Sequence, residues 1–333
     1  MRAHWEVSTQ PRAPLPRLGF GGAVIGNLYR EVSEEAALAA VDAAWNLGIR
    51  YFDTAPHYGL GLAERRLGSA LASKDRDEWV LSTKVGRLLV PNRHRTGSDS
   101  AGFDVPDDLR RQWDFSRDGV LRSIEESLLR LGVDRLDIVF VHDPDDHADE
   151  AIERAAPALT DLREQGVIRA WGVGMNQWEI PARFVRETDI DIVMLAGRFT
   201  LLDQSAADDL LPLCLERRID VVNVGVFNSG LLSKPRPAAD TTYDYQTAPP
   251  DLVRRTNEIA DLCQEFGTDL PTAALAFSYA HPAVKSVAVG MRSSAQVESV
   301  VSMSEAAVPE ELWTALADRG LVNWIESPNR RHS

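Results

Sequence analysis

The chain has 333 residues, 44% hydrophobic and 26% charged, so it can bury a large core and disorder is not expected. Its formal net charge of -14 repels nucleic-acid phosphates and anionic lipid, which predicts no nucleic-acid and no membrane partner. The two cysteines, Cys214 and Cys263, have no CxxC partner and fit a reducing, cytoplasmic compartment. The N-terminal residues lack the apolar core of a signal peptide, and no apolar run is long enough to span a membrane.

Short apolar runs alternate with segments of helical period along the chain. Ser33 suits the N-cap of a first helix that ends near residue 47, and Gly48 suits its stop. The strands are expected at residues 18–20, 50–52, 79–84, 136–141, 170–173, 190–195, 220–224 and 286–289. Further helices are expected at residues 62–72, 117–131, 150–165, 180–187, 205–217 and 252–266.

This order of elements predicts the fold class. Alternating strands and helices indicate a parallel sheet covered on both faces, and eight such units predict a closed (β/α)8 TIM barrel. No linker divides the chain, so residues 1–333 are expected to form a single barrel domain. An open, doubly wound sheet is the competing interpretation.

Two long irregular stretches, residues 87–116 and 234–250, follow predicted strands. Long loops at this face of a barrel are usually functional, so both are candidates for substrate binding. A mobile surface loop is the simpler alternative. The aromatic residues in these stretches are candidates to line a pocket: Phe103, Trp113, Phe115, Tyr243 and Tyr245.

Polar residues stand at consecutive strand ends. Asp53, Lys84 and His142 each end a predicted strand, and Tyr58 follows five residues after Asp53. Because the ends of parallel strands meet at one rim of a barrel, we expect these side chains to lie together. Each residue alone has a simpler explanation, as a helix cap, a solvated charge or a core histidine; the combination is what points to chemistry.

The chemistry expected of this group is proton transfer. A free tyrosine has a pKa of about 10, and an adjacent ammonium lowers it by about 1–3 units. Tyr58 beside Lys84 is therefore expected to exchange a proton with a substrate oxygen. Asp53 is expected to hold Lys84 in place, because a buried ammonium needs a partner, and His142 to orient the substrate oxygen by a hydrogen bond.

Several segments resemble the signatures of the aldo/keto reductases. They read YFDTAPHYGLGLAERRLGSAL, STKVGR, LDIVFVHDPD and GVIRAWGVG, and the resemblance runs from RLGFGG to VGMRSSAQVESVV. It implies a (β/α)8 barrel and a catalytic tetrad of Asp53, Tyr58, Lys84 and His142. The segments LGFGGAVIGNLY, DFS, HDPD and VAVGMRSSAQVESV further resemble the aldose 1-dehydrogenase subgroup, whose members act on L-fucose, D-threo-aldoses or L-galactose. By that resemblance the chain oxidises C1 of a free sugar to a lactone.

The cofactor implied by the resemblance is NAD or NADP. No glycine run matches GxGxxG followed by an acidic residue, so a Rossmann site is not expected. Family members instead bind the dinucleotide at the barrel mouth through the last two loops, with a helix beginning near Ser293 to meet phosphate. The contacts so implied are Gly21, Gly22, Asp53, Asn176, Phe227, Asn228, Ser229, Gly230, Leu231, Gly290, Met291, Arg292, Ser293 and Gln296.

Departures from the family pattern bear on the choice of cofactor. NADP-specific members place a Lys near position 290 and an Arg near 296, where this chain has Gly290 and Gln296. Arg292 is the remaining cation. Since phosphate is normally held by dedicated Arg or Lys residues, NAD is favoured over NADP. The nicotinamide-contacting positions also differ, with Gly174–Met175 and Ala196 in place of the usual residues, and Val300 replaces the adenine-contacting Asn.

Other functions stay open from the sequence. A pyridoxal dehydrogenase or a general aldehyde and ketone reductase would use the same fold and tetrad. A cofactor-binding regulatory subunit is an alternative of another class, although it would not need Tyr58. A metal hydrolase is disfavoured, because no HxH or HExxH spacing occurs and Lys84 would repel a cation, so no metal is expected. Monomer and homodimer are both compatible with the sequence.

Overall fold

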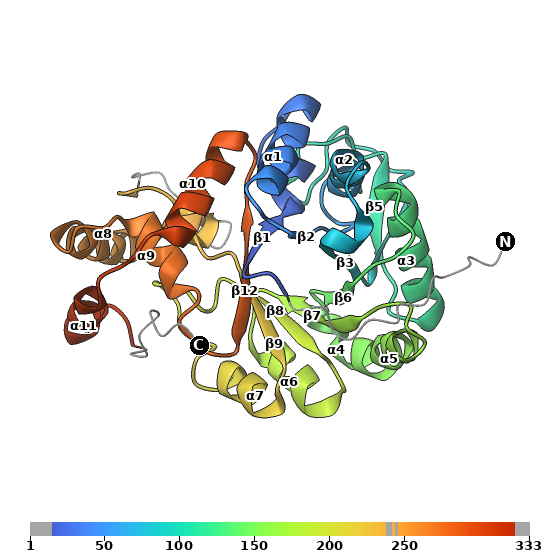
Figure 1. The fold of residues 1–333 in the computed structure, drawn as a ribbon. Coiled ribbons are helices and arrows are strands. Elements are labelled where there is room, and N and C mark those ends of the chain that lie inside the picture. The colour runs from blue at the N-terminus through green and yellow to red at the C-terminus, as the bar shows by residue number, and fades with distance from the viewer. Residues whose placement is uncertain (1–14, 238–241, 244–245, 324–333) are drawn as a thin grey trace.

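The computed structural model describes residues 15–237, 242–243 and 246–323. Eight parallel strands close into a barrel in the order β1-β12-β9-β8-β7-β6-β3-β2 (Figure 1). These strands are β1 (Leu18–Gly21), β2 (Tyr51–Asp53), β3 (Val80–Val85), β6 (Ile138–His142), β7 (Ala170–Met175), β8 (Ile192–Ala196), β9 (Asp220–Val224) and β12 (Val284–Gly290). Each overlaps a strand expected from the sequence. The closure confirms the (β/α)8 prediction and rules out the open sheet.

Helices surround the barrel on its outside (Figure 1). They are α1 (Glu34–Asn46), α2 (Leu62–Leu71), α3 (Arg117–Leu131), α4 (Ala148–Glu150), α5 (Ala156–Glu164), α6 (Glu179–Glu187), α7 (Leu210–Arg217), α8 (Pro250–Glu265), α9 (Leu270–Phe277), α10 (Ser294–Glu305) and α11 (Glu310–Asp318). The Ser33 side chain accepts a hydrogen bond from the Ala36 amide, which confirms it as the N-cap of α1. None of the helices in the described part combines the length and apolar character needed to cross a bilayer.

Several features differ from the sequence expectation. Helix α11 was not expected, and within the stretch 234–250 the short strands β10 (Thr242–Tyr243) and β11 (Gln246–Thr247) pair antiparallel. The stretch 87–116 is not irregular throughout: β4 (Arg87–Pro91) and β5 (Leu109–Trp113) pair antiparallel as a hairpin. Its exposed strand is rich in charge, which hid the period-2 pattern. Helix α9 was missed because it is buried on nearly every side and therefore shows no amphipathic period. Helix α7 begins at Leu210 rather than at 205, since the preceding residues form turns.

Side chains fill the barrel interior toward the end at which the strands begin. These side chains form one cluster of Tyr51, Val80, Ile138, Phe140, Ala170, Ile192, Met194, Val222 and Ala288, and Leu15 packs against it. A packed interior excludes a pore through the barrel, so binding is confined to the rim where the strands end. That rim carries the residues described next.

Candidate active site

Asp53 and Lys84 form a buried ion pair at the rim. Asp53 ends β2 and pairs in register with Ser82 of β3, so Lys84 lies two residues further along the same face. The Lys84 Nζ donates to Asp53 Oδ1 at 2.8 Å, to Asp53 Oδ2 at 2.7 Å and to the Thr54 carbonyl oxygen at 2.9 Å. Ser82 Oγ donates to Asp53 Oδ1 at 2.6 Å. The ammonium and the carboxylate are thus each held in one position.

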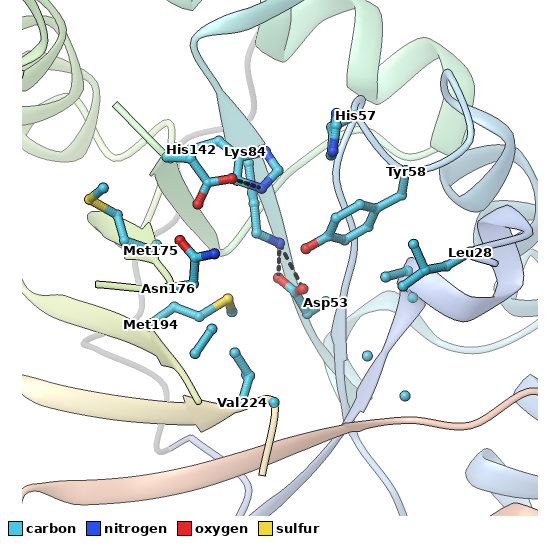
Figure 2. Close-up of a pocket in the computed structure, with 18 of the residues that line it drawn as sticks. Leu28, Asp53, His57, Tyr58, Lys84, His142, Met175, Asn176, Met194 and Val224 are labelled. Atoms are coloured by element: carbon cyan, nitrogen blue, oxygen red, sulfur yellow. Dashed lines mark hydrogen bonds and ion pairs between the residues drawn. The ribbon is translucent and has the colours of Figure 1, made fainter. Parts of the chain in front are cut away.

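Tyr58 lies against this ammonium. The Lys84 Nζ is 4.7 Å from the centroid of the Tyr58 ring, and the hydroxyl of Tyr58 points toward Lys84 and into the cavity (Figure 2). The turn that carries Tyr58 is fixed by close backbone packing. Gly59 has φ +61°, and a Cβ there would lie 2.3 Å from the Gly26 carbonyl oxygen. Only glycine allows the two backbone segments to approach so closely. This packing fixes the backbone from which the Tyr58 side chain extends.

Two histidines complete the group around Tyr58. His142 ends β6, and its ring centroid is 5.7 Å from that of Tyr58 and 5.4 Å from that of His57. Burial, reinforced by Arg87, lowers the pKa of His142 well below its ordinary value. The same causes lower the pKa of His57 from 6.5 to about 2. Both rings are therefore neutral at physiological pH, and each has one N–H to donate.

The buried histidines predict an acid-sensitive stability. Because the pKa of His57 is depressed on folding, the unfolded chain takes up a proton as the pH falls below 6.5 while the folded protein does not. The resulting change in the free energy of unfolding is absent above pH 6.5, and it destabilises the folded protein increasingly below that pH. Each such histidine adds a slope of at most about 1.4 kcal/mol per pH unit. Urea unfolding between pH 6.5 and 5 should therefore give a shallower pH dependence for His57→Gln. His94→Gln, at an exposed position, serves as the control and should keep the wild-type slope.

The tetrad opens onto a cavity of about 620 Å³. Its lining mixes the polar residues above with apolar side chains, including Leu28, Met175 and Met194 (Figure 2). Of the five aromatic residues expected to line a pocket, Phe103 does so. Phe115 is fully buried and Trp113 stacks on it with ring centroids 5.7 Å apart, so neither lines the cavity. Tyr243 packs against the core away from the cavity, and Tyr245 lies outside the described residues.

A second cavity of about 470 Å³ adjoins the first and shares part of its lining. The residues expected to contact a cofactor divide as follows. Gly21, Gly22 and Asp53 line the first cavity, Asn176 and Gly290 line both, and Phe227, Asn228, Ser229, Gly230, Arg292 and Gln296 line the second.

Three of the expected cofactor residues do not reach either cavity. The side chains of Leu231 and Met291 are fully buried in the core. Ser293 instead caps α10, where its hydroxyl oxygen accepts a hydrogen bond from the Gln296 amide. The Met291 side chain points into the core because Gly290, the last residue of β12, faces the cavity. Successive residues of an extended chain face opposite sides.

The lining of the second cavity suits a group that carries negative charge, such as the phosphates of a dinucleotide. Gly290 and the Val24 side chain approach closely in its wall, since a Cβ at Gly290 would lie 3.1 Å from Val24. Asn228 Oδ1 is buried without a hydrogen-bond partner among the described residues. Burial lowers the pKa of the Arg292 guanidinium and the nearby Arg30 lowers it further, so two cations stand together at this end. Arg30 was not singled out by the sequence.

The sequence also left unassigned several residues of the first cavity, among them His57, Arg87 and Asp143. The last two carried a usable signal, since Asp143 follows the strand-end residue His142 directly and Arg87 stands three residues after Lys84. The described part of the chain holds no group of three or more His, Cys, Asp or Glu able to bind a metal ion.

Comparison with known proteins identifies the family. The sequence profile of the aldo/keto reductase family matches residues 17–318. The chain belongs to the aldo/keto reductase family. It is an oxidoreductase of this family, and enzymes of the family use NAD(P)H.

Named relatives support a place near the aldose dehydrogenases. This aldo/keto reductase is 46% identical to a D-threo-aldose 1-dehydrogenase of Pseudomonas sp. over 95% of its length and 98% of the relative's. It is 40% identical to a pyridoxal 4-dehydrogenase of Microbacterium luteolum, covering 92% of this chain and 94% of that one. A solved structure of an aldo-keto reductase from Bacillus halodurans in its holo form has a TM-score of 0.70 at 26% identity, covering 99% of this chain and 100% of that chain.

Proposed function

We propose that this aldo/keto reductase oxidises C1 of a free aldose of the L-fucose, L-galactose or D-arabinose type to its lactone, with NAD as the preferred cofactor. The observation that carries the proposal is the phenol of Tyr58 held over the buried Lys84–Asp53 pair at the mouth of a cavity lined by polar and apolar side chains. The 46% identity to a D-threo-aldose 1-dehydrogenase supports the choice of substrate class.

In the proposed mechanism Tyr58 acts as general acid and base. Tyr58 accepts the proton of the C1 hydroxyl on its Oη, as the phenolate. The adjacent Lys84 ammonium stabilises this phenolate before the transfer. A bound nicotinamide dinucleotide supplies the acceptor for the hydride that leaves C1. The bond order at C1 rises from C–O to C=O as the hydride departs, so electrons and protons balance.

His142 and Asp53 serve this proton transfer in different ways. The neutral ring of His142 donates an N–H to the C1 oxygen and so fixes its position between donor and base. Asp53 keeps the ammonium from turning away, because it accepts with both carboxylate oxygens. The backbones of Leu28 and Phe103 form an isolated β-bridge, and their side chains belong to one apolar cluster with Tyr58. This cluster limits water access on the Tyr58 side.

NAD is proposed over NADP because Gly290 and Gln296 leave no dedicated cation at the two positions where a 2′-phosphate is usually gripped. The pair Arg30 and Arg292 is then available to the pyrophosphate that both dinucleotides share. We propose further that the enzyme acts in the cytoplasm, since its two cysteines are buried free thiols that suit a reducing compartment. For the oligomeric state, both a monomer and a homodimer remain predictions.

The proposal is tested by a screen of aldoses and cofactors. We expect NAD reduction with at least one of L-fucose, L-galactose and D-arabinose, and a lower kcat/KM with NADP than with NAD, measured by absorbance of the reduced dinucleotide. Pyridoxal belongs in the same screen, because the relative from Microbacterium luteolum acts on it. Oxidation of pyridoxal without oxidation of any sugar would replace the aldose proposal by a pyridoxal dehydrogenase.

A further inference from the structure

An ion pair beside the tetrad has no part in the proposed proton transfer. Arg87 follows β3 and begins β4, Asp143 follows β6, and both line the cavity with Tyr58 and His142. The Arg87 Nη2 donates to Asp143 Oδ2 at 2.7 Å. Their side chains are 14% and 27% exposed, so the pair is largely withdrawn from bulk water yet faces the cavity.

The pair is held in place from both sides. The Arg87 guanidinium lies 4.5 Å above the Trp113 ring, and its Nη1 is 3.3 Å and 3.4 Å from the two ring nitrogens of His57. Near-equal distances to both nitrogens indicate that it lies over the face of the imidazole. His57 is itself fixed, since Arg111 Nη2 donates to its carbonyl oxygen at 2.8 Å. The guanidinium thus contacts two rings as well as Asp143, which restricts its rotation.

Asp143 is held in an unusual backbone conformation. It has φ +40°, in the left-handed region, and its amide donates to the Gly174 carbonyl oxygen at 3.0 Å. Such a conformation costs a non-glycine residue free energy, and residues that keep it cluster at binding sites. Here it places the carboxylate at the cavity wall, with Oδ2 3.5 Å from His142 Nε2.

The pair retains unused hydrogen-bonding capacity. No described residue donates a hydrogen bond to Asp143 Oδ1, so this oxygen can accept one from a ligand in the cavity. Burial raises the pKa of Asp143 while Arg87 opposes this, so the carboxylate is costly to keep without further donors. A ligand that both donates and accepts hydrogen bonds would satisfy this wall.

We propose that Arg87 and Asp143 recognise the C2 hydroxyl of the aldose and thereby set the preference of the enzyme for polyhydroxylated substrates. A hydroxyl can donate to the carboxylate and accept from the guanidinium, which matches the two groups of the pair. The position follows from His142, since its Nε2 lies next to Asp143 and its N–H is assigned to the C1 oxygen. The substituent one carbon from C1 is therefore the one within reach. This inference rests on the proposed aldose oxidation.

The test compares two substrates that differ only at C2. D-arabinose and 2-deoxy-D-ribose share the configuration at C3 and C4, so their ratio of kcat/KM isolates the C2 hydroxyl. We expect Asp143→Asn to lower this ratio by about ten-fold, because it replaces the charged acceptor of the hydroxyl with a neutral amide. Asn tolerates a positive φ, so the variant is expected to fold. Arg87→Gln should lower the ratio in the same direction. Any intrinsic effect of the hydroxyl on C1 reactivity is common to all variants and cancels.

Matched controls and opposite outcomes are available. Arg110→Gln lies in the same hairpin and Asp146→Asn in the same loop as Asp143, both exposed, and each should keep the wild-type ratio. NADH binding, followed by fluorescence, should be unchanged in Asp143→Asn. If the variants lose activity on both sugars equally, or on neither, the pair does not read the C2 hydroxyl and the inference is refuted while aldose oxidation stands. If the wild type oxidises no aldose, the proposed function itself fails and takes the inference with it.

Discussion

Tyr58→Phe is expected to lower kcat for aldose oxidation by about a hundred- to ten-thousand-fold while NADH binding is retained. The substitution removes only the hydroxyl that accepts the proton from the C1 oxygen. The ring that packs against Phe103 and His142 stays, with centroids 6.0 Å and 5.7 Å away, so the cavity keeps its shape. Steady-state kinetics with the best aldose and fluorescence titration with NADH measure the two quantities separately.

The matched control is Tyr279→Phe. This tyrosine donates its hydroxyl to the Arg17 carbonyl oxygen and lines neither cavity, so the same chemical change is made away from the tetrad. Its kcat should stay within about two-fold of the wild type, because mutational effects at distant, independent sites are small. If Tyr58→Phe turned over at the wild-type rate, another group would have to carry the proton, and the mechanism proposed for Tyr58 would be wrong.

Lys84→Met is expected to destabilise the folded protein by about 3–5 kcal/mol and to abolish measurable turnover. The substitution leaves the Asp53 carboxylate buried and unpaired, with the donor from Ser82 as its remaining side-chain partner. The loss of stability thus comes from a stranded charge, and the loss of turnover from the missing ammonium beside Tyr58. Urea unfolding and steady-state kinetics measure the two effects.

A double variant separates stability from catalysis. Lys84→Met combined with Asp53→Asn removes both charges, so part of the lost stability should return, since replacing both partners of a buried pair costs less than stranding one. Turnover should not return with it. A double variant that regained activity along with stability would mean that the pair acts only by holding the fold, and that Tyr58 does not depend on the ammonium.

Much of the fold was predictable because its elements are local. The eight barrel strands were predicted from short apolar runs, and the caps at Ser33 and Gly48 from residue types that satisfy helix ends. Helix α9 was not predicted, because it is buried among other elements and a buried helix has no polar face to mark its period. The β4–β5 hairpin escaped because pairing between residues 87 and 113 depends on a long-range register.

The rim residues were predictable for a geometric reason. Parallel strands all run in one direction, so residues ending them in sequence must end at one rim in space, which groups Asp53, Lys84 and His142. Side chains just beyond the strands follow no such rule, because the direction in which each points depends on its turn and on its neighbours. Leu231 and Met291 therefore turn into the core although the adjoining Gly230 and Gly290 reach the cavity.

By itself, then, the sequence determined the barrel, its family and the grouping of Asp53, Lys84 and His142 at one rim, since periodicity and direction are encoded locally. The tertiary structure alone decided the contacts between loops distant in the chain. It places Arg87 against Asp143, 56 residues apart, and it buries His57 beside Arg87 and Arg111, which lowers the pKa of its ring and keeps it neutral. Burial and the field of neighbouring charges set these properties, and both arise only when the loops come together in space.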